Sequence, residues 1–393
     1  MDATDLRIAL FSGNYNYVRD GANQALNRLV EYLLRRGAQV RIYSPTVEKP
    51  ALPPMGEVFS IPAVPIPGRG EYRFPLLLPP SAKRDIRAFQ PNILHVASPD
   101  VLGHRAITLA HRLDRPVVAS VHTRFETYLR YYGLAFLEPV IEAILRRFYR
   151  RCDAIFAPSD SMAQLLREQR MNYNVGIWTR GIDTEIFHPG RRDLAWRQAL
   201  GIADDVPVVG FVGRLVMEKG LDVFSDAIDC LERRQVQHKV LVVGEGPARD
   251  WFEKRLPNAI FAGFQGGPDL GRAVASMDML FNPSVTETFG NVTLEAMACA
   301  LPVVAAIATG SQSLVTDGVT GRLIRPGAIE AFADALAYYC RDSNSRLGAG
   351  QAGLEVSRRY GWDQVNEALV NGYLRTIRHR AAGGRRPQPS PVP

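Results

Sequence analysis

The stretch LRIALFSGNYNYVRDGANQALNRLVEYLLRRGAQVRIYS, from Leu6 to Ser44, decides the fold. Its apolar run over 6–11 predicts a buried strand, and the spaced apolar residues over 22–36 predict an amphipathic helix. Gly37 stands where such a helix ends, and the apolar run over 39–44 predicts the next strand. A strand, a helix and a second strand in this order form a βαβ unit, from which parallel sheets are built.

The same rhythm of short apolar runs and longer helical patterns continues along the chain. Four more runs predict strands in the first half, and five follow in the second half after a break. They cover 92–96, 117–121, 154–157 and 175–179, then 206–212, 239–243, 260–262, 279–282 and 303–305. Solidly apolar runs are typical of parallel strands that are buried on both faces. The sequence therefore predicts an α/β protein with two Rossmann-like, doubly wound parallel-sheet domains facing a cleft.

The domain boundaries follow from where this rhythm stops and restarts. We expect an N-terminal domain over 1–183, a linker over 184–205 and a C-terminal domain over 206–358. A helical segment over 359–380 is expected to cross back to the first domain. The last residues, 381–393, are rich in Gly, Arg and Pro, a composition that cannot pack a core, so we expect a disordered tail there.

Length and composition narrow the class of protein. The chain has 393 residues, of which 46% are hydrophobic and 22% charged, which excludes a fibrous or intrinsically disordered protein. No apolar run approaches the roughly 20 residues of a membrane-spanning helix, and the amino terminus is acidic, unlike a signal peptide. The four cysteines are scattered. We therefore expect reduced thiols in a cytoplasmic protein.

The segment PSVTETFGNVTLEAMA, over 283–298, is the most informative about function. It follows an expected strand and opens an expected helix, the position at which open α/β sheets bind ligands. Gly290 would let the backbone approach a ligand, and the amides of 291–293 would lie at a helix N-terminus suited to phosphate. Glu287 and Glu295 would bind hydroxyl groups on either side of that phosphate. The alternative is that Glu287 caps the helix and Glu295 faces solvent.

A second loop, FVGRLVMEKG over 211–220, carries cations at the end of another expected strand. Arg214 and Lys219 would neutralise a nucleotide diphosphate as a leaving group, without a bound metal. The alternative is a solvated loop in which Glu218 pairs with a neighbour. A glycine on either side of the basic segment favours the functional interpretation.

Together with two further motifs, these loops resemble the retaining glycosyltransferases of the GT-B fold, in the large family-four group. The further motifs are Gly244-Glu245-Gly246-Pro247 and Gly181-Ile182-Asp183 followed by Phe187. The resemblance covers nearly the whole chain, and the motifs stand in the order of that group. Within it, the chain is similar to the GDP-mannose-dependent α-mannosyltransferases and the sulfoquinovosyl and other lipid glycosyltransferases.

The resemblance implies a role for each motif residue in binding a nucleotide-sugar donor. Arg214 and Lys219 contact the diphosphate, Glu295 binds the ribose, and Glu287 with the backbone of 289–290 binds the transferred sugar. The expected donor-binding residues are Gly13, Gly21, Gly213, Arg214, Lys219, Gly244, Gly263, Phe264, Glu287, Phe289, Gly290, Asn291, Val292 and Glu295. The expected catalytic residues are His122, Glu287, Arg214 and Lys219.

The first domain is expected to bind the acceptor. Its loop after the first strand contains Tyr15, Tyr17 and Arg19, an aromatic and basic set that would grip an acceptor. For the tyrosines, a flexible surface loop is the alternative. His122 follows the expected strand over 117–121 and matches the histidine that the resembling enzymes place beside the sugar, so we expect it on the acceptor side as well.

We expect neither a metal nor a cofactor. No Asp-x-Asp occurs in the chain, which argues against the glycosyltransferase architecture that holds a metal on the diphosphate. No carboxylate presents itself as a nucleophile, so we favour front-face departure and attack within one ion pair, in which the leaving phosphate takes the acceptor proton. Ala300 stands where many relatives have Gly, and Gly310 lacks the Gly and acid that follow it in many relatives. Both departures concern the sugar pocket.

The expected partners are a nucleotide-sugar donor, a lipid or glycan acceptor and an anionic membrane, with no nucleic acid. The net charge of +7 suits anionic partners in general. The aromatic and aliphatic segment 128–137, with the basic residues that follow it, is suited to an anionic bilayer. Those residues are Arg146, Arg147, Arg150 and Arg151. The alternative is a core segment followed by a solvated basic helix face.

The segment 122–128 resembles that of enzymes with lipid acceptors, so we expect a lipid acceptor first and a soluble or polymeric saccharide second. We therefore expect the protein at the cytoplasmic face of the plasma membrane. For the donor, GDP-mannose stands first, before UDP-glucose and UDP-glucuronate. Two other classes stay open: an epimerase or phosphorylase on the same scaffold, and a noncatalytic nucleotide-sugar-binding protein.

Overall fold

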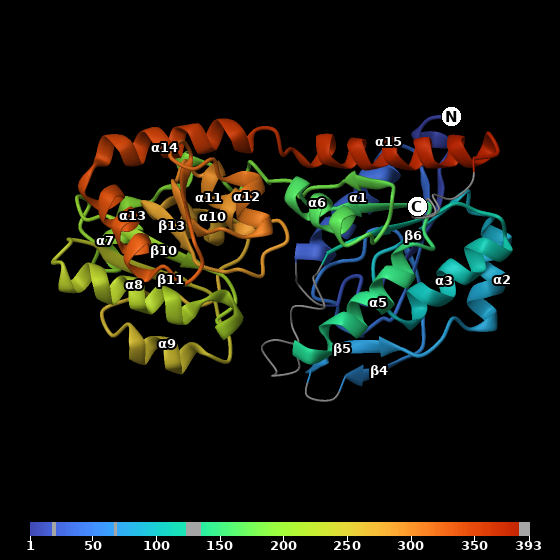
Figure 1. Ribbon diagram of the computed structural model, residues 1–393, viewed down its shortest axis with the longest axis horizontal. Helices are drawn as coiled ribbons and strands as arrows, with labels where there is room; N and C mark the ends of the chain where they lie inside the picture. Colours follow the sequence, from blue (N-terminus) through green and yellow to red (C-terminus); the bar gives the residue numbers. More distant parts are fainter. Residues whose placement is uncertain (18–20, 67–68, 123–134, 385–393) are drawn as a thin grey trace, which may run out of the picture. The chain divides into compact units, whose positions relative to one another are not determined.

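The computed structural model describes residues 1–17, 21–66, 69–122 and 135–384. The chain divides into two units, Met1–Arg180 with Trp362–Pro393, and Gly181–Gly361. In Figure 1 the first unit runs from blue to green and includes the red helix α15, and the second unit runs from yellow-green to orange-red. The two units are described one at a time.

The first unit contains a seven-stranded sheet in which all neighbouring strands are parallel. Its strand order is β3-β2-β1-β6-β7-β8-β9, so the order reverses between β1 and β6. The strands are β1 (Arg7–Phe11), β2 (Gln39–Ser44), β3 (Glu57–Ser60), β6 (Ile93–Val96), β7 (Val117–Ser120), β8 (Ala154–Ala157) and β9 (Val175–Ile177). The sequence predicted all of these except β3.

Helices cover both faces of this sheet. The buried side chains of α1 and α15 pack on one face, and those of α2, α3, α5 and α6 pack on the other. These helices are α1 (Gly21–Arg35), α2 (Pro80–Phe89), α3 (Val101–Arg112), α5 (Glu138–Tyr149), α6 (Asp160–Glu168) and α15 (Trp362–Ala381), with 3-10 turns at Ala3–Asp5 and Ala135–Leu137. The segment expected over 359–380 is thus represented by α15, which belongs to the first unit.

An antiparallel hairpin of β4 (Ala63–Ile66) and β5 (Arg69–Pro75) stands apart from the sheet of the first unit. The sequence did not predict this hairpin, because Pro65 and Pro75 interrupt the alternation of a regular strand. The hairpin is fastened to the loop after β1, where the backbone N–H of Arg73 donates to the hydroxyl of Tyr17 at 3.3 Å.

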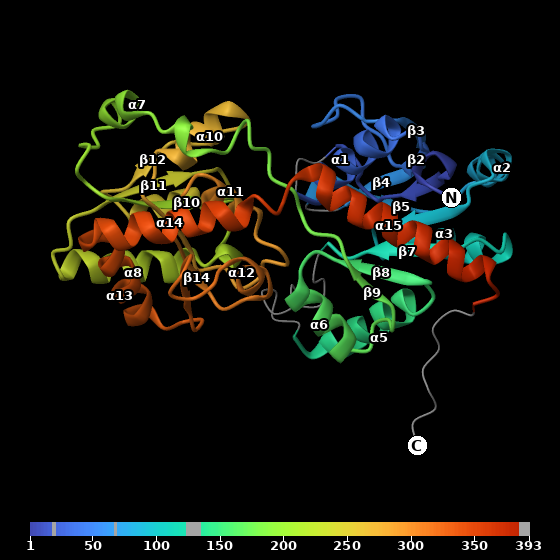
Figure 2. The same cartoon turned by 90° about the horizontal axis from the view of Figure 1, so that it is seen from above.

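The second unit contains a six-stranded parallel sheet in the order β12-β11-β10-β13-β14-β15, which reverses between β10 and β13. Its strands are β10 (Val208–Val212), β11 (Lys239–Val243), β12 (Ile260–Phe261), β13 (Met279–Asn282), β14 (Val303–Ala306) and β15 (Gly321–Ile324), of which the sequence did not predict β15. Figure 2 shows helices on either side of this sheet. They are α7 (Leu194–Ala199), α8 (Leu221–Arg233), α9 (Arg249–Arg255), α10 (Pro268–Ala275), α11 (Asn291–Ala298), α12 (Thr309–Leu314), α13 (Ile329–Arg341) and α14 (Ser343–Ser357), with 3-10 turns at Pro189–Arg191 and Met217–Lys219.

The prediction of a linker over 184–205 is wrong. Arg197 is fully buried, pairs with Asp278 at 2.9 Å and donates to the carbonyl oxygen of Val206 at 2.8 Å. Phe187 and Ile202 are buried in the same core. This segment is therefore an integral part of the second unit, and the chain passes between the units at 180–181 and 361–362. The strand rhythm is lost because the segment folds as turns and the short helix α7.

Both sheets have the strand order of doubly wound α/β domains, in which a ligand binds at the point of reversal. The prediction of two Rossmann-like parallel-sheet domains is confirmed. Among the described residues, no helix has the length and apolar character needed to cross a membrane. The last nine residues of the expected tail, 385–393, lie outside the described residues.

Candidate active site

The site in the second unit lies where its strand order reverses. β10 and β13 are parallel neighbours at this point. Ligands of open α/β sheets bind outside the carboxyl ends of the strands there. The loops that follow these two strands cover 213–220 and 283–290, and both were predicted from the sequence to bind the donor.

Lys219 and Glu287 meet at this point although they are 68 positions apart in the sequence. Nζ of Lys219 lies 2.5 Å from Oε1 of Glu287, and the side chains are 30% and 19% exposed. Gly220 allows the two loops to approach, because a Cβ there would lie 3.2 Å from the carbonyl oxygen of Pro283, and its φ of +74° suits glycine. The structure thus places a cation and a carboxylate side by side at the ligand-binding edge.

Arg214 lies in the same loop but in a different environment. Its side chain is exposed, and no hydrogen bond or ion pair joins it to another described residue. Gly213, which precedes it, has a φ of +147°, and its carbonyl oxygen would lie 1.9 Å from a Cβ on Gly244. The two glycine loops therefore pack backbone against backbone. This packing leaves the guanidinium group of Arg214 available to an anion.

Helix α11 begins directly after the loop that carries Glu287. Gly290 precedes the helix with a φ of +94°, which suits glycine. Phe289 is 3% exposed and packs edge-on against Tyr360, so its ring belongs to the core and only its backbone can face a ligand. The amides of 291–293 form the first turn of α11, where the helix dipole favours a phosphate.

The loop of Glu287 is also held from the side of β14. The hydroxyl of Thr309 and the amide of Gly310 both donate to the carbonyl oxygen of Glu287, at 2.7 and 2.9 Å. A Cβ on Gly310 would lie 2.7 Å from the carbonyl carbon of Phe289. Glycine is therefore required at 310 for this contact, and the backbone of the donor loop is fixed from both sides.

Glu295 lies one turn into α11 and is partly buried. Burial, and to a smaller extent the charge of Glu287, raises the pKa of the Glu295 carboxyl to about 7. This carboxyl therefore gains or loses its charge close to neutral pH, and a ligand that donates hydrogen bonds to it favours the charged form. Across the described ranges, no group of three His, Cys, Asp or Glu side chains is arranged to hold a metal ion.

The structure brings the residues expected near the nucleoside to the same edge of the sheet. The amide of Gly244 donates to the carbonyl oxygen of Gly263 at 2.8 Å, because β11 and β12 are parallel neighbours. Phe264, the next residue, is 63% exposed. An exposed ring at this edge offers a surface on which a planar base can stack.

The first unit has its own point of reversal, between β1 and β6. Gly13 follows β1, and Asp100 follows β6 as the N-cap of α3, accepting the amide of Gly103 at 2.8 Å. A Cβ on Gly13 would lie 2.5 Å from Oδ2 of Asp100, so the carboxylate fills the space beside the glycine. Burial raises the pKa of Asp100 to about 6. Gly21 is the first residue of α1.

The expectation that Tyr15 and Tyr17 grip an acceptor is wrong. Tyr15 is fully buried and donates to the carbonyl oxygen of Met55 at 2.8 Å. Tyr17 is 8% exposed and donates to the carbonyl oxygen of Gly13. Both side chains are buried and hold the loop from within through these hydrogen bonds. Arg19 lies outside the described residues.

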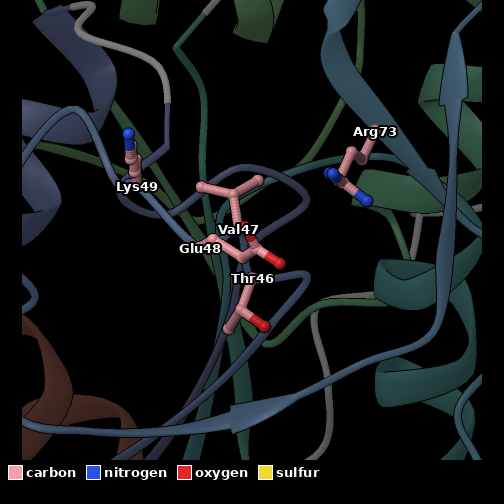
Figure 3. Close-up of a pocket in the computed structure, with 5 residues that line it drawn as sticks. All are labelled: Thr46, Val47, Glu48, Lys49 and Arg73. Carbon is pink, nitrogen blue, oxygen red and sulfur yellow. The ribbon is translucent and has the colours of Figure 1, made fainter.

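An open hollow of about 790 Å³ lies at the carboxyl end of β2, lined by Thr46, Val47, Glu48, Lys49 and Arg73. In Figure 3, the guanidinium group of Arg73 extends toward the oxygen atoms of Glu48 and Thr46, and Lys49 points away from them. Arg73 makes no side-chain hydrogen bond or ion pair with another described residue. Mixed hydroxyl, carboxylate and cationic groups suit a polar ligand that carries hydroxyl groups.

His122 follows β7 and has both ring nitrogens in hydrogen bonds. Nε2 lies 2.8 Å from Oγ of Ser120, and Nδ1 lies 2.8 Å from an Nη of Arg180. Burial, followed by the positive charge of Arg180, holds the pKa of His122 well below its usual value. The structure thus places His122 at the carboxyl edge of the first sheet, as expected, and as a neutral side chain.

Sequence reasoning missed two residues of this edge. Asp100 follows the strand predicted over 92–96. This strand pairs with the strand that leads to Gly13, and the pairing could have identified Asp100 as a residue of the same edge. Arg180 is 4% exposed and follows β9 by three residues. It had no such signal, because a single Arg after an edge strand does not predict a buried position.

The membrane-docking face of four arginines stays a prediction, but three of these arginines already have partners within the first unit. Arg146, Arg150 and Arg151 donate hydrogen bonds within the first unit, at 2.9, 2.9 and 2.7 Å. These bonds join α5 and the residues after it to neighbouring segments. Arg147 is exposed and has no hydrogen bond or ion pair with another described residue.

The aromatic part of the predicted docking segment lies mostly outside the described residues, which resume at 135. The described part continues into an exposed apolar stripe formed by the 3-10 turn before α5 and by α5 itself. Phe136 lies in the turn and is 73% exposed. Val140 and Ile144 are 54% and 48% exposed, and their spacing of four residues places them on one face of α5.

Two family models match the chain: Glycosyltransferase Family 4 over residues 19–186 and Glycosyl transferases group 1 over residues 206–342. The chain is 31% identical to a GDP-mannose-dependent alpha-mannosyltransferase of Mycobacterium tuberculosis, over 95% of this chain and 98% of the relative. It is also 31% identical to the sulfoquinovosyl transferase SQD2 of Arabidopsis thaliana, over 93% of this chain and 72% of the relative.

Solved structures share the fold over most of the chain. Sucrose-phosphate synthase of Thermosynechococcus elongatus superposes with a TM-score of 0.74 at 19% identity, over 96% of this chain and 99% of that chain. WaaG, a glycosyltransferase involved in lipopolysaccharide biosynthesis, superposes with a TM-score of 0.69 at 18% identity, over 93% and 99%. At such identities the likeness concerns the fold.

Proposed function

The chain is a glycosyltransferase of family four with the GT-B fold, as the sequence predicted, and from that premise we propose that it transfers a hexosyl group from a nucleotide sugar. The proposed donor is GDP-mannose, and the proposed acceptor is a lipid or glycan at the cytoplasmic face of the membrane. The observation that carries this proposal is the group of Lys219, Glu287 and Glu295 at the reversal point of the second sheet.

The proposed donor site follows from the charges at this edge. The diphosphate is bound by Arg214, Lys219 and the first amides of α11, which supply positive charge without a metal. Glu295 accepts hydrogen bonds from the ribose hydroxyls, and Glu287 does the same for the transferred sugar. Lys219 already pairs with Glu287, so donor binding exchanges one ionic partner of the lysine for another.

The proposed reaction proceeds with retention of configuration. The bond between the anomeric carbon and the diphosphate oxygen breaks, and the acceptor oxygen bonds to the same carbon from the same face. The proton of the acceptor hydroxyl passes to the leaving diphosphate. The cations stabilise the charge that develops on this leaving group, and stabilisation of developing charge is a large catalytic contribution in many enzymes.

The choice of donor is supported by the names of the relatives. The relatives from Mycobacterium tuberculosis and from Corynebacterium glutamicum are both GDP-mannose-dependent alpha-mannosyltransferases, the latter 28% identical over 95% of this chain and 89% of the relative. The match to the sulfoquinovosyl transferase favours a second candidate, the transfer of a different hexosyl group from a UDP-sugar to a lipid.

The lipid acceptor is supported by features of the first unit. The exposed stripe of Phe136, Val140 and Ile144 suits the surface of a bilayer. The hollow that contains Arg73 suits the polar headgroup of an acceptor. Both lie in the unit that carries His122, the residue expected beside the transferred sugar.

The test supplies separately labelled GDP-mannose, UDP-glucose and UDP-glucuronate to the purified protein, with and without a lipid extract. The proposal expects label from GDP-mannose in the organic phase only when lipid is present. Label carried from a UDP-sugar would select the second candidate. Binding of all donors without transfer to lipid or saccharide, or rearrangement of the sugar without an acceptor, would overturn the proposal in favour of a binding protein or an epimerase.

A further inference from the structure

Five side chains of the first unit form one continuous row of hydrogen bonds. Arg180 bonds to His122 at 2.8 Å, and His122 bonds to Ser120 at 2.8 Å. Ser120 bonds to His95 at 2.8 Å, and His95 bonds to Tyr373 at 2.6 Å. The row starts three residues after β9, crosses β7 and β6, and ends on α15, which runs across the sheet of the first unit in Figure 2.

The first two bonds of the row have a fixed direction, because the guanidinium group of Arg180 only donates hydrogen bonds. Nδ1 of His122 must therefore accept, and in the neutral ring Nε2 then carries the proton and donates it to Oγ of Ser120. At the other end, the buried hydroxyl of Tyr373 lies against Nδ1 of His95 and can donate to it. Nε2 of His95 then carries the proton of that ring and also donates to Oγ of Ser120, which can accept from both histidines.

Most of the row is enclosed by the protein. His95 and Tyr373 are fully buried, Ser120 is 2% exposed and Arg180 is 4% exposed. His122 is half-buried. Trp178 packs edge-on against both histidines, with ring centroids 6.0 Å from His95 and 5.7 Å from His122. Because water has little access, a proton on the wrong nitrogen would leave a buried group without its partner.

Among the described residues, the charged and titratable groups that act on His122 are Arg180 and His95, and Tyr373 faces His95 from α15. Burial lowers the pKa of His95 to about 3 and raises the pKa of Tyr373 well above its usual value. All groups between the guanidinium of Arg180 and the end of the row therefore stay uncharged at neutral pH.

We propose that Arg180 and Tyr373 are positioning residues, which hold His122 as the neutral tautomer protonated on Nε2. The inference rests on the proposed function in one respect, the place of His122 beside the acceptor. It adds that His122 takes no proton from the acceptor while its Nδ1 is bonded to Arg180. His122 thus presents a fixed neutral side chain at the carboxyl edge of the first sheet, and α15 supports it from the far end of the row.

The direct test is the ring nitrogen spectrum of histidine-labelled protein, which requires no activity. A His122→Asn variant assigns the signals of His122. In the wild type we expect one protonated and one unprotonated ring nitrogen at His122, unchanged between about pH 5 and pH 8. Titration of His122 in this range, or a proton on its Nδ1, would overturn the proposal.

Variants at the two ends of the row make the test sharper. Arg180→Gln replaces an obligate donor by an amide that can also accept, so His122 should begin to titrate or populate its other tautomer. Tyr373→Phe removes one hydroxyl from α15 and should change the tautomer signals of His95. The matched control is Thr376→Val, which removes a buried hydroxyl that bonds only within α15. Equal spectra for Tyr373→Phe and Thr376→Val would contradict the proposal.

Kinetics separate this inference from the proposed function. Where transfer is measured, Arg180→Gln should lower kcat roughly ten- to hundred-fold through loss of alignment, with the KM for the donor unchanged. Arg180→Lys keeps an obligate donor and should recover part of the rate. A failure to find any acceptor would count against the proposed function and leave the spectrum of His122 to decide the inference. A wild-type rate in Arg180→Gln would overturn it.

Discussion

Lys219 and Glu287 bind each other at 2.5 Å where the proposed donor diphosphate would lie. The donor diphosphate must therefore displace the carboxylate of Glu287 from its ion pair with Lys219. The cost of breaking this pair is modest, because both side chains are partly exposed and screened by solvent. Release of Glu287 at the moment of binding would make its carboxylate available to the sugar hydroxyls.

The first prediction concerns the two cations of this site. Lys219→Ala and Arg214→Ala should each weaken binding of GDP, because each removes a charge-assisted contact worth about 1.5–3 kcal/mol, or roughly ten- to hundred-fold in Kd. Lys219→Ala also leaves Glu287 unpaired beside the diphosphate. Addition of Glu287→Gln to Lys219→Ala should therefore recover part of the affinity.

Titration calorimetry with GDP measures these effects. Lys254→Ala, which removes an exposed lysine from α9, is the matched control and should bind GDP like the wild type. Wild-type affinity in Arg214→Ala and Lys219→Ala would show that the cations do not contact the diphosphate.

The second prediction follows from the raised pKa of Glu295, which is about 7. A ribose hydroxyl bonds best to the charged carboxylate, so GDP affinity should rise with pH through about 7 in the wild type and stay flat in Glu295→Gln. The stability of the free protein should change in the opposite direction. Because the folded state holds the proton more tightly than the unfolded state, stability falls as pH rises between the two pKa values.

Calorimetry and thermal unfolding at about pH 5.5 and pH 8 check both signs. Glu295→Gln should gain stability relative to the wild type as the pH rises. A GDP affinity that depends on pH equally in the wild type and in Glu295→Gln would contradict the assignment of the ribose to this carboxyl.

The third prediction concerns the end of helix α11. Ala300 follows this helix with a left-handed φ of +57°, which costs an alanine about 1 kcal/mol and a glycine nothing. Ala300→Gly should therefore stabilise the protein by about 0.5 kcal/mol, after the greater chain entropy of glycine is subtracted. Ala298→Gly, inside α11, is the control and should destabilise it. A lower Tm in Ala300→Gly than in the wild type would contradict the backbone strain at Ala300.

The fourth prediction concerns the exposed stripe of α5. Val140→Ser with Ile144→Ser should reduce binding to anionic vesicles, because the variant loses apolar surface from the proposed docking face. Leu347→Ser removes an exposed leucine from α14 in the second unit and is the matched control. Arg147 is the one arginine of the predicted four with no described partner, so added salt should weaken binding only by about 1 kcal/mol.

Sedimentation with vesicles at low and moderate salt checks this prediction. Equal pelleting of the Val140→Ser, Ile144→Ser variant and the wild type would favour a soluble acceptor. A strong loss of pelleting in salt would point to more basic residues at the surface than the described part of α5 provides.

At the scale of elements, the sequence predicted what local patterns determine. Interior strands such as β2, β8 and β11 are rich in apolar residues and were located to the residue. The edge strands β3 and β15 escaped prediction, because each is only four residues long and includes a charged residue, so its apolar run is short. The segment 184–205 was assigned to a linker because its burial depends on Arg197 and Asp278, an ion pair that no periodicity reveals.

The donor side of the site was predictable and the acceptor side was only partly so, for a physical reason. Apart from Gly13 and Gly21, the expected donor residues lie in loops or helix starts that follow strands of the second sheet, and parallel strands bring their carboxyl ends together whatever the detail of the loops. In the first unit, the orientation of Tyr15 and the burial of Arg180 depend on side-chain packing. Such packing is decided by residues distant in the sequence.

At the scale of the whole molecule, each unit contributes one reversal point and one set of chemical groups. The second unit carries cations and carboxylates that suit a nucleotide sugar. The first unit carries a neutral histidine, a half-buried carboxyl at Asp100 whose pKa is raised, and an open polar hollow. This division is what transfer between a charged donor and a hydroxyl-bearing acceptor requires.

The central claim is that the second unit activates a nucleotide sugar for transfer. The most direct measurement follows labelled mannose from GDP-mannose into lipid-extractable product for the wild type, Lys219→Ala and Lys254→Ala. We predict equal transfer by the wild type and Lys254→Ala, and at least a ten-fold lower rate for Lys219→Ala, about 1.4 kcal/mol of transition-state stabilisation. Equal rates for all three proteins, or no product from the wild type with any nucleotide sugar, would contradict the account.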